Sequence, residues 1–158
     1  MTGWRVGYAA GPTNVINAMN KVQSQNVSST ASISMAASVE ALTGDQSFIT
    51  SHNESFLRRR DLVVKHLNET PGLSCRVPEG AFYVFASCKG VLGKKTESGK
   101  IIEADGDFMD YLLEEVGVAG VQGSAFGLDG FFRISYATSD SILEDACQRI
   151  KLACSKLS

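Results

Sequence analysis

The sequence lacks the features that mark membrane, secreted and nucleic-acid-binding proteins. No apolar run approaches the roughly 18 residues of a membrane helix, and the first residues have neither the basic nor the apolar stretch of a signal peptide. With three prolines and 20% charged residues, the chain has little of the composition of a disordered protein. Its net charge of −2 gives no attraction to polyanions. We therefore expect a globular, cytoplasmic protein that binds neither nucleic acid nor membrane.

The four cysteines do not form a metal-binding pattern. No C-x-x-C pair occurs, and the two histidines, His52 and His66, are distant from the cysteines in sequence. Cys147 and Cys154 are seven residues apart in a segment with helical spacing, so we expect both to face the core as small apolar residues. The sequence thus predicts no metal site, and for the thiols it favours a structural role over a redox role.

Apolar spacing and turn residues predict a mixture of helices and strands. We predict strands over 4–10, 81–86, 118–121 and 131–137, and helices over 12–24, 31–43, 45–69, 108–116 and 140–156. Residues 87–106 are expected to form a mobile loop with a short hairpin around Gly99. Ser141 and Glu144 have capping-box spacing near the start of the last helix. This order of elements predicts α/β or α+β packing, with a first segment of residues 1–45 and a compact unit over 46–158.

Three consecutive arginines, Arg58 to Arg60, lie within the predicted long helix. They could indicate a phosphate site, but three successive positions point around a helix and not to one spot. We therefore expect a solvated helix face with local ion pairs.

Two other arginines interrupt apolar segments that we predict to be strands. Arg5 lies between Trp4 and Val6, and Arg133 lies between Phe132 and Ile134. A buried guanidinium needs an anion within reach, and its planar fork suits a carboxylate or a phosphate. The residues alone slightly favour the alternative, in which each arginine points to solvent from an edge strand.

Three motifs that include these arginines resemble a known family. They read G-W-R-V-G-Y over residues 3–8, P-E-G-A-F-Y over 78–83 and F-R-I-S-Y-A over 132–137. In this order they resemble the C-terminal part of the pyridoxal-phosphate-dependent aminotransferases of class I and II, and most of all their bacterial aspartate aminotransferase branch. The resemblance extends over essentially the whole chain. It implies the C-terminal part of the pyridoxal-phosphate-dependent transferase fold, in which a small mixed sheet is flanked by helices.

The resemblance also implies roles for individual residues. Arg5 would contact the phosphate of pyridoxal 5'-phosphate, and Arg133 would bind the α-carboxylate of the amino acid or 2-oxo acid. Both roles suit the geometry of a guanidinium. Phe126, in a Gly-rich turn, would approach the substrate, whereas the segment 80–83 would have a structural role near the mouth of the site. Residues 1–45 would be the remnant of the large cofactor-binding domain, and 46–158 the small domain.

The chain departs from the family pattern in what it does not contain. The lysine that attaches the cofactor covalently lies shortly before Met1 by the family's spacing, and the aspartate that holds the pyridine nitrogen lies further upstream. None of the lysines present occupies the matching position. We therefore assign no catalytic residue to this chain and expect it to be inactive by itself.

Three functions follow as hypotheses. The first is the reaction of the intact enzyme, a homodimer that converts aspartate and 2-oxoglutarate to oxaloacetate and glutamate. The second is a non-catalytic module that self-associates or binds a partner through a sheet edge left exposed in the first 45 residues. The third keeps the fold but changes the chemistry to another pyridoxal-phosphate enzyme, such as a lyase or synthase, or to a branch that uses aromatic substrates or prephenate.

Overall fold

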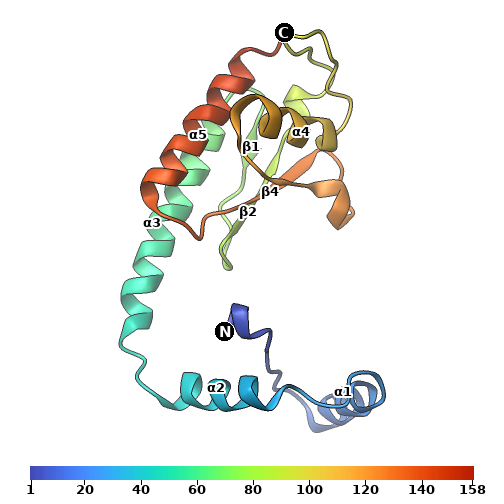
Figure 1. Cartoon of the computed structure of the whole chain (residues 1–158), viewed down its shortest axis with the longest axis vertical. Coiled ribbons are helices and arrows are strands. Elements are labelled where there is room, and N and C mark those ends of the chain that lie inside the picture. The colour runs from blue at the N-terminus through green and yellow to red at the C-terminus, as the bar shows by residue number, and fades with distance from the viewer. The chain divides into compact units, whose positions relative to one another are not determined.

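The chain divides into two compact units. The computed structural model describes all of residues 1–158, and the units are Met1–Ile49 and Thr50–Ser158 (Figure 1). No helix combines the length and the apolar character that crossing a membrane requires. The assignment of these units to a large and a small domain stays a prediction.

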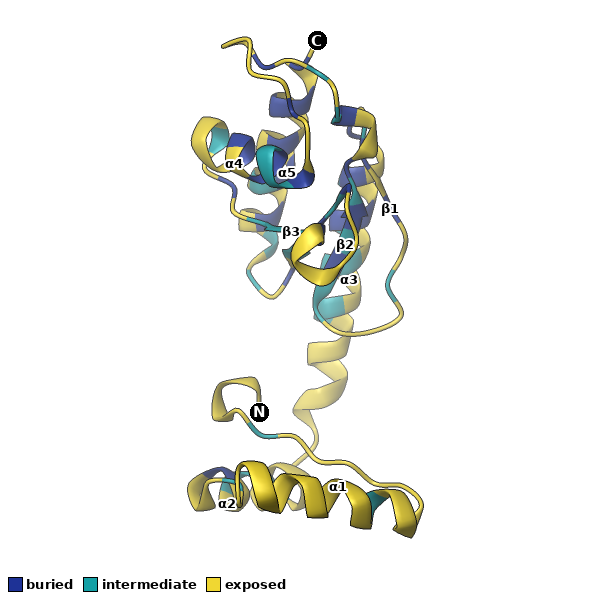
Figure 2. Cartoon of the chain, turned by 90° about the vertical axis from the view of Figure 1, so that its right-hand side faces the viewer, coloured by how far each residue is buried: buried dark blue, intermediate teal, exposed yellow.

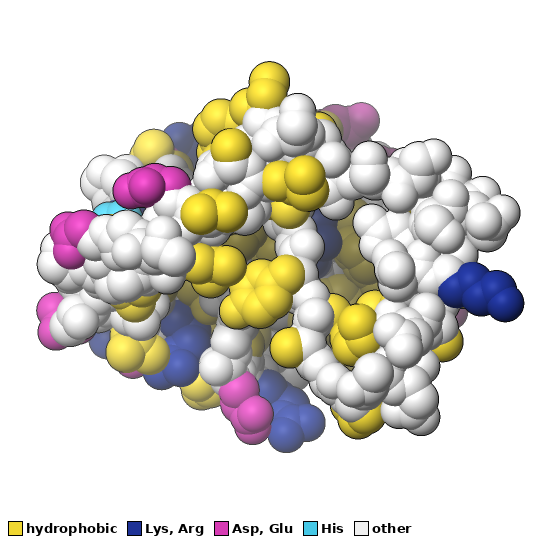
Figure 3. All heavy atoms as spheres, turned by 90° about the horizontal axis from the view of Figure 1, so that it is seen from below, with side chains coloured by type: hydrophobic (Ala, Val, Ile, Leu, Met, Phe, Trp, Pro, Cys, Tyr) yellow, Lys and Arg dark blue, Asp and Glu magenta, His cyan; other side chains and the backbone are white.

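The first unit consists of short helical elements with almost no buried side chain. It contains a 3-10 helix η1 (Thr2–Trp4) and the helices α1 (Thr13–Asn26) and α2 (Ser32–Thr43). Almost all of this unit is exposed (Figure 2). Ser34 is its only buried residue, and the Ser34 hydroxyl donates a hydrogen bond to the Trp4 carbonyl at 2.9 Å. Figure 3 shows hydrophobic side chains at the surface of this unit, where α1 and α2 expose Val15, Met19, Val22, Ile33, Met35, Val39 and Leu42. The unit therefore has no apolar core of its own.

The predicted strand over residues 4–10 is wrong. Its start belongs to η1, Arg5 has a left-handed backbone with φ 53°, and residues 6–10 have no regular structure. Residues that favour strands form one only where a partner strand supplies backbone hydrogen bonds, and no strand of this chain pairs with them. The exposed sheet edge on which the second hypothesis rested is consequently not present.

The second unit is a four-stranded sheet with helices, and it confirms the predicted fold class. Its strands are β1 (Ser74–Cys75), β2 (Tyr83–Ser87), β3 (Val121–Gln122) and β4 (Phe131–Ser135) in the order β1-β2-β4-β3. We expected a mixed sheet, but all three strand pairings are antiparallel. The helices are α3 (Phe48–Asn68), α4 (Asp105–Val116) and α5 (Asp140–Ser155), and η2 (Lys89–Val91) and η3 (Gly123–Phe126) are 3-10 turns.

One face of the sheet forms the core with the helices. Val84, Ala86 and Phe132 alternate along β2 and β4 and are completely buried. The Phe132 ring meets the ring of Phe108 on α4 edge to face, with centroids 5.5 Å apart. The opposite face carries the partly exposed side chains of these strands, including Arg133. This alternation decides which side chains are left free for binding.

The cysteines pack as predicted. All four are buried and unbonded to one another, and Cys147 and Cys154 lie in the core side of α5. Burial raises the pKa of Cys147 to about 11 and that of Cys154 to about 12, so both thiols stay protonated at neutral pH. No group of three or more histidine, cysteine or acidic side chains is arranged to hold a metal ion.

The arginine triplet forms ion pairs, but only one of them is local as expected. Arg58 and Arg59 both donate to the Asp140 carboxylate at 2.8 Å and so tie α3 to the first turn of α5. Arg60 pairs with its neighbour Asp61 at 2.8 Å. None of the three is left for a phosphate.

The local structure differs from the sequence predictions in several places. Residues 87–106, expected to form a mobile loop, contain η2 and the completely buried side chains of Val91 and Ile102. The strand expected over 118–121 is shifted to β3 (Val121–Gln122). The N-cap of α5 is Ser139, whose hydroxyl oxygen accepts from the Ile142 amide, so the predicted capping box at Ser141 is two residues late. The sequence does not predict strand β1, because the strand has only two residues. The Asn68 side chain holds it by donating to the Cys75 carbonyl and accepting from the Cys75 amide. The hairpin around Gly99 is confirmed by a bridge between residues 95 and 101.

Replacing Phe132 tests the position of the core. We expect Phe132→Ala to lower the free energy of unfolding by about 3–5 kcal/mol, because it leaves a cavity between β4 and α4. Ile142→Ala, at an exposed position of α5, should change it by no more than about 0.5 kcal/mol. Urea denaturation followed by circular dichroism measures both, and equal losses would contradict the assignment of the core.

Candidate substrate-binding site

Arg133 lies in the middle of the sheet, on the face that the core does not cover. On β4 it is directly opposite Phe85 of β2 and Val121 of β3. Its guanidinium carbon lies 4.5 Å from the centre of the Tyr83 ring and 4.6 Å from that of Phe126. It takes part in none of the ion pairs of the chain. Arg133 is therefore a half-buried cation surrounded by aromatic rings and without a protein anion.

A small cavity lies beside this cation. It has a volume of about 180 Å³ and is lined by Tyr83, Ala119, Gly120, Val121, Arg133 and Ser135. Gly120 keeps the wall thin, since a Cβ there would lie only 2.7 Å from the Met109 sulfur. A cation at the wall of an otherwise aromatic and small-residue cavity suits one small anionic group.

Phe126 is held beside Arg133 by the turn that carries it. Its ring meets that of Phe85 edge to face, with centroids 6.0 Å apart. The turn η3 is fixed by Asp105, which is 2% exposed and whose carboxylate accepts from the Ser124 amide at 2.7 Å. The structure thus brings together two residues, Arg133 and Phe126, to which the family resemblance gave roles at the substrate, and those roles stay a prediction.

Burial and hydrogen bonding have opposite effects on Asp105. Burial by itself would raise the pKa of this carboxyl group, but hydrogen bonds from the amide and hydroxyl of Ser124 and from the backbone of Asp105 and Gly130 outweigh it. The pKa therefore lies below its ordinary value, and the group is a carboxylate at neutral pH.

Arg5 differs from the sequence prediction. The guanidinium was expected to be buried in a strand, but the residue is exposed and follows a 3-10 turn. The only hydrogen bond of its side chain goes to the Thr2 carbonyl oxygen at 3.4 Å, and it forms no ion pair. The Arg5 side chain is not buried, because no strand pairs with residues 4–10. Its positive charge nevertheless has no carboxylate partner. Within its unit Arg5 is available to an anion.

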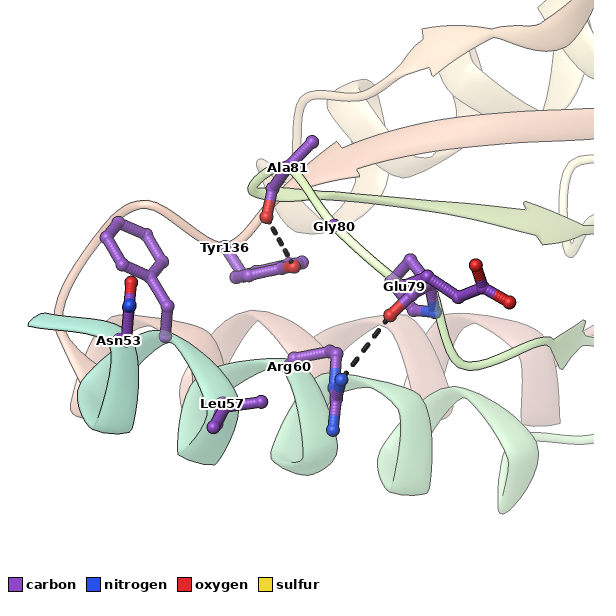
Figure 4. Close-up of a pocket in the computed structure, with 9 residues that line it drawn as sticks. Asn53, Leu57, Arg60, Glu79, Gly80, Ala81 and Tyr136 are labelled. Atoms are coloured by element: carbon purple, nitrogen blue, oxygen red, sulfur yellow. Dashed lines mark hydrogen bonds between the residues drawn. The ribbon is translucent and has the colours of Figure 1, made fainter. Parts of the chain in front are cut away.

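A second cavity, in the unit Thr50–Ser158, links two of the motifs. It lies between α3 and the loop before β2, with a volume of about 320 Å³ (Figure 4). There the Tyr136 hydroxyl donates to the Ala81 carbonyl at 2.9 Å, and the Tyr136 amide donates to the Phe82 carbonyl at 2.9 Å. Arg60 donates to the Pro78 carbonyl at 3.4 Å. The motif over 132–137 therefore anchors the motif over 78–83.

Tyr83 is the residue of this site that the sequence prediction missed. It was assigned only a structural role, as part of the strand 80–83. Its position directly opposite Ser135 places its ring beside Arg133. An aromatic residue three positions after the motif glycine Gly80 was the only signal, and it is equally typical of a core strand.

Comparison with known proteins identifies the family. The sequence profile of the class I and II aminotransferases matches residues 1–150. The chain is 62% identical over 158 residues to the aspartate aminotransferase of Rhizobium meliloti, strain 1021. The match extends over all of this chain and 38% of that protein. The chain is 53% identical over 158 residues to the aspartate/prephenate aminotransferase of Cereibacter sphaeroides, of which it covers 40%. The chain belongs to the class I and II aminotransferase family.

Solved structures agree with this assignment. A crystal structure of the aspartate aminotransferase from Rhizobium meliloti superposes with a TM-score of 0.86 at 62% identity, over 100% of this chain and 40% of that one. The aspartate aminotransferase of Thermus thermophilus with maleate gives a TM-score of 0.77 at 38% identity, over 97% of this chain and 38% of that one. The chain thus spans about two fifths of the length of its relatives and matches part of their fold.

The buried carboxylate makes a testable contribution to stability. Because its folded pKa is lowered, Asp105 stabilises the fold in full above its unfolded pKa of about 3.9, and this stabilisation is lost as the pH falls through the folded value. We expect Asp105→Asn to have a lower urea midpoint than the wild type at pH 7, with the difference shrinking below about pH 4. Asp110→Asn, at an exposed position of α4, is the control and should follow the wild type throughout. Parallel pH profiles for wild type and Asp105→Asn would contradict this role.

Proposed function

We propose that the chain is the C-terminal part of a pyridoxal-phosphate-dependent aspartate aminotransferase. In the intact protein, a homodimer, the reaction would convert aspartate and 2-oxoglutarate to oxaloacetate and glutamate. Residues 1–45 would belong to the large domain and residues 46–158 to the small domain. The names of the relatives support the substrate, and one structural observation supports the role of this chain: the unpaired Arg133 beside a small cavity.

Arg133 would bind the α-carboxylate that the amino acid and the 2-oxo acid share. Its guanidinium has no protein carboxylate to pair with, so its donors are free for a ligand. A bidentate pair with a carboxylate uses two parallel charge-assisted hydrogen bonds. The relative from Thermus thermophilus was solved with maleate, a dicarboxylate, and this is the class of anion that we propose for Arg133.

Phe126 would contact the substrate next to its carboxylate. Its side chain is 50% exposed although it is aromatic, so one side of the ring is free while the other side faces Arg133. An apolar ring at this place would exclude water from the ion pair, which strengthens the pair.

Arg5 fits the phosphate of the cofactor in charge and availability. The side chain is exposed, has no carboxylate partner and is held only by a long hydrogen bond to a backbone carbonyl. When bound, pyridoxal 5'-phosphate supplies the electron sink for amino transfer. We propose that Arg5 donates to its phosphate group, as an arginine fork favours.

We expect the isolated chain to bind substrate-like anions but not to catalyse transamination. In the family the lysine that attaches the cofactor stands before the segment that this chain matches, and none of its own lysines is equivalent. A second substrate, prephenate, is supported by the name of the relative from Cereibacter sphaeroides. Prephenate also carries carboxylates, so Arg133 would have the same role for either substrate.

A chimera with a complete relative tests this function. We expect the chain, fused in place of the matching segment of the Rhizobium meliloti enzyme, to give an active aspartate aminotransferase, since the two segments are 62% identical. Arg133→Ala in the chimera should raise KM for both aspartate and 2-oxoglutarate at least about tenfold, because a hydrogen bond to a charged group contributes about 1.5–3 kcal/mol.

The control for this experiment is Arg149→Ala. Arg149 is an exposed arginine of α5 that pairs with Asp145, and its loss should leave both KM values unchanged. Steady-state kinetics with each substrate varied in turn measures the effect. Unchanged KM values for Arg133→Ala would remove Arg133 from the substrate site.

A further inference from the structure

We propose that Tyr83 and Phe126 are positioning residues that clamp the Arg133 guanidinium from two sides and so make it selective for planar carboxylates over tetrahedral anions. The three residues are called the arginine clamp below. The proposal rests on the proposed role of Arg133 and deepens it, because it names what gives that residue its selectivity.

The distances define the clamp. The guanidinium carbon lies 4.5 Å from the Tyr83 ring centre and 4.6 Å from the Phe126 ring centre, both well within the roughly 6 Å of a cation–π contact. The two rings do not contact each other, although each contacts other rings nearby. They therefore approach the cation from different sides, and Tyr83 and Arg133 both line the cavity of about 180 Å³.

Tyr83 is held in place by the sheet. It is directly opposite Ser135 in the β2–β4 register, two positions along from the pair of Phe85 and Arg133. Its ring also packs on that of Phe82, with centroids 4.4 Å apart, and the Phe82 carbonyl accepts from the Tyr136 amide. The backbone of Tyr83 is thus held by the strand pairing, and its ring is held beside Arg133 by packing on Phe82.

Phe126 is held by a turn outside the sheet and by a second residue of β2. Asp105 fixes the turn through the Ser124 amide. The Phe126 ring leans edge to face on Phe85, which in turn stacks on Phe131 with centroids 5.6 Å apart and an angle of 7°. Two separate supports therefore hold the two sides of the clamp, which is typical of a site in which the position of a side chain matters.

The clamp favours one shape of anion. A carboxylate can meet the free edge of the guanidinium in its own plane through two parallel hydrogen bonds. A tetrahedral anion that uses the same two bonds directs its remaining oxygens out of that plane, toward the faces of the rings, which carry partial negative charge. The rings also reduce the freedom that Arg133 loses on binding, since the side chain is held before the ligand arrives.

Binding and NMR measurements on the full 158-residue chain test the clamp. The probes are maleate, as the planar dicarboxylate, and sulfate, as the tetrahedral anion. The Arg133 Nε–Hε resonance should be displaced by ring currents in the wild type and should return toward its ordinary position in Tyr83→Leu and in Phe126→Leu. Each leucine variant should bind maleate about 2- to 30-fold more weakly, as expected for the loss of one cation–π contact, and should lose preference for maleate over sulfate.

Two further variants serve as controls. Tyr83→Phe keeps the ring and should retain both the displaced resonance and the preference for maleate. Tyr8→Leu removes an exposed aromatic ring from the first unit and should change neither. Because each leucine variant affects a different side of the clamp, either one that folds is sufficient for the test.

The outcomes separate the clamp from the proposed function. If Arg133→Ala abolishes maleate binding while both leucine variants bind as the wild type does, the clamp is wrong and the role of Arg133 stands. If the leucine variants weaken maleate and sulfate equally, the rings aid binding without selecting, and the selectivity is refuted. Maleate binding that is absent in the wild type or unchanged in Arg133→Ala would overturn the role proposed for Arg133 in this chain.

Discussion

The pairing of β2 with β4 is the constraint on which the rest of the second unit depends. Its register places Val84, Ala86 and Phe132 on the face that packs against the helices. The same register forces the alternate residues, among them Tyr83 and Arg133, onto the opposite face. A slip of one residue would bury the guanidinium and expose the core, so the energy of the apolar core also fixes the position of the cation.

Polar contacts from outside these strands complete the arrangement. Tyr136, just beyond β4, holds the segment before β2 through its hydroxyl and its amide. Asp105, at the start of α4, holds the turn that carries Phe126. Both are buried, and a buried polar group is costly unless it is hydrogen-bonded, so these contacts leave few alternatives to the observed positions. Residues without any contact to a ligand thereby determine the geometry of the site.

The two units differ in what holds them together. The second unit contains the whole buried cluster of apolar side chains, whereas the first buries only Ser34 and leaves the apolar residues of α1 and α2 exposed. Few buried contacts mean low local stability, so we expect the backbone amides of the first unit to exchange faster than those of the sheet. The role proposed for Arg5 depends on this less supported unit, while the role proposed for Arg133 depends on the well-packed one.

The sequence by itself determined the helices, the main strands and the buried cysteines, because apolar periodicity is a local signal. Its motifs drew attention to Arg133 and Phe126 only through their resemblance to a family. The sequence failed at residues 4–10, where strand-forming side chains have no partner, and at Tyr83, whose sequence context is that of any core strand. Only the tertiary structure decided that Tyr83 and Phe126 meet Arg133 from two sides. Tyr83 and Arg133 are 50 positions apart, and Phe126 and Arg133 are seven positions apart in different elements. Both contacts exist only once the strand register and the Asp105-bound turn are in place.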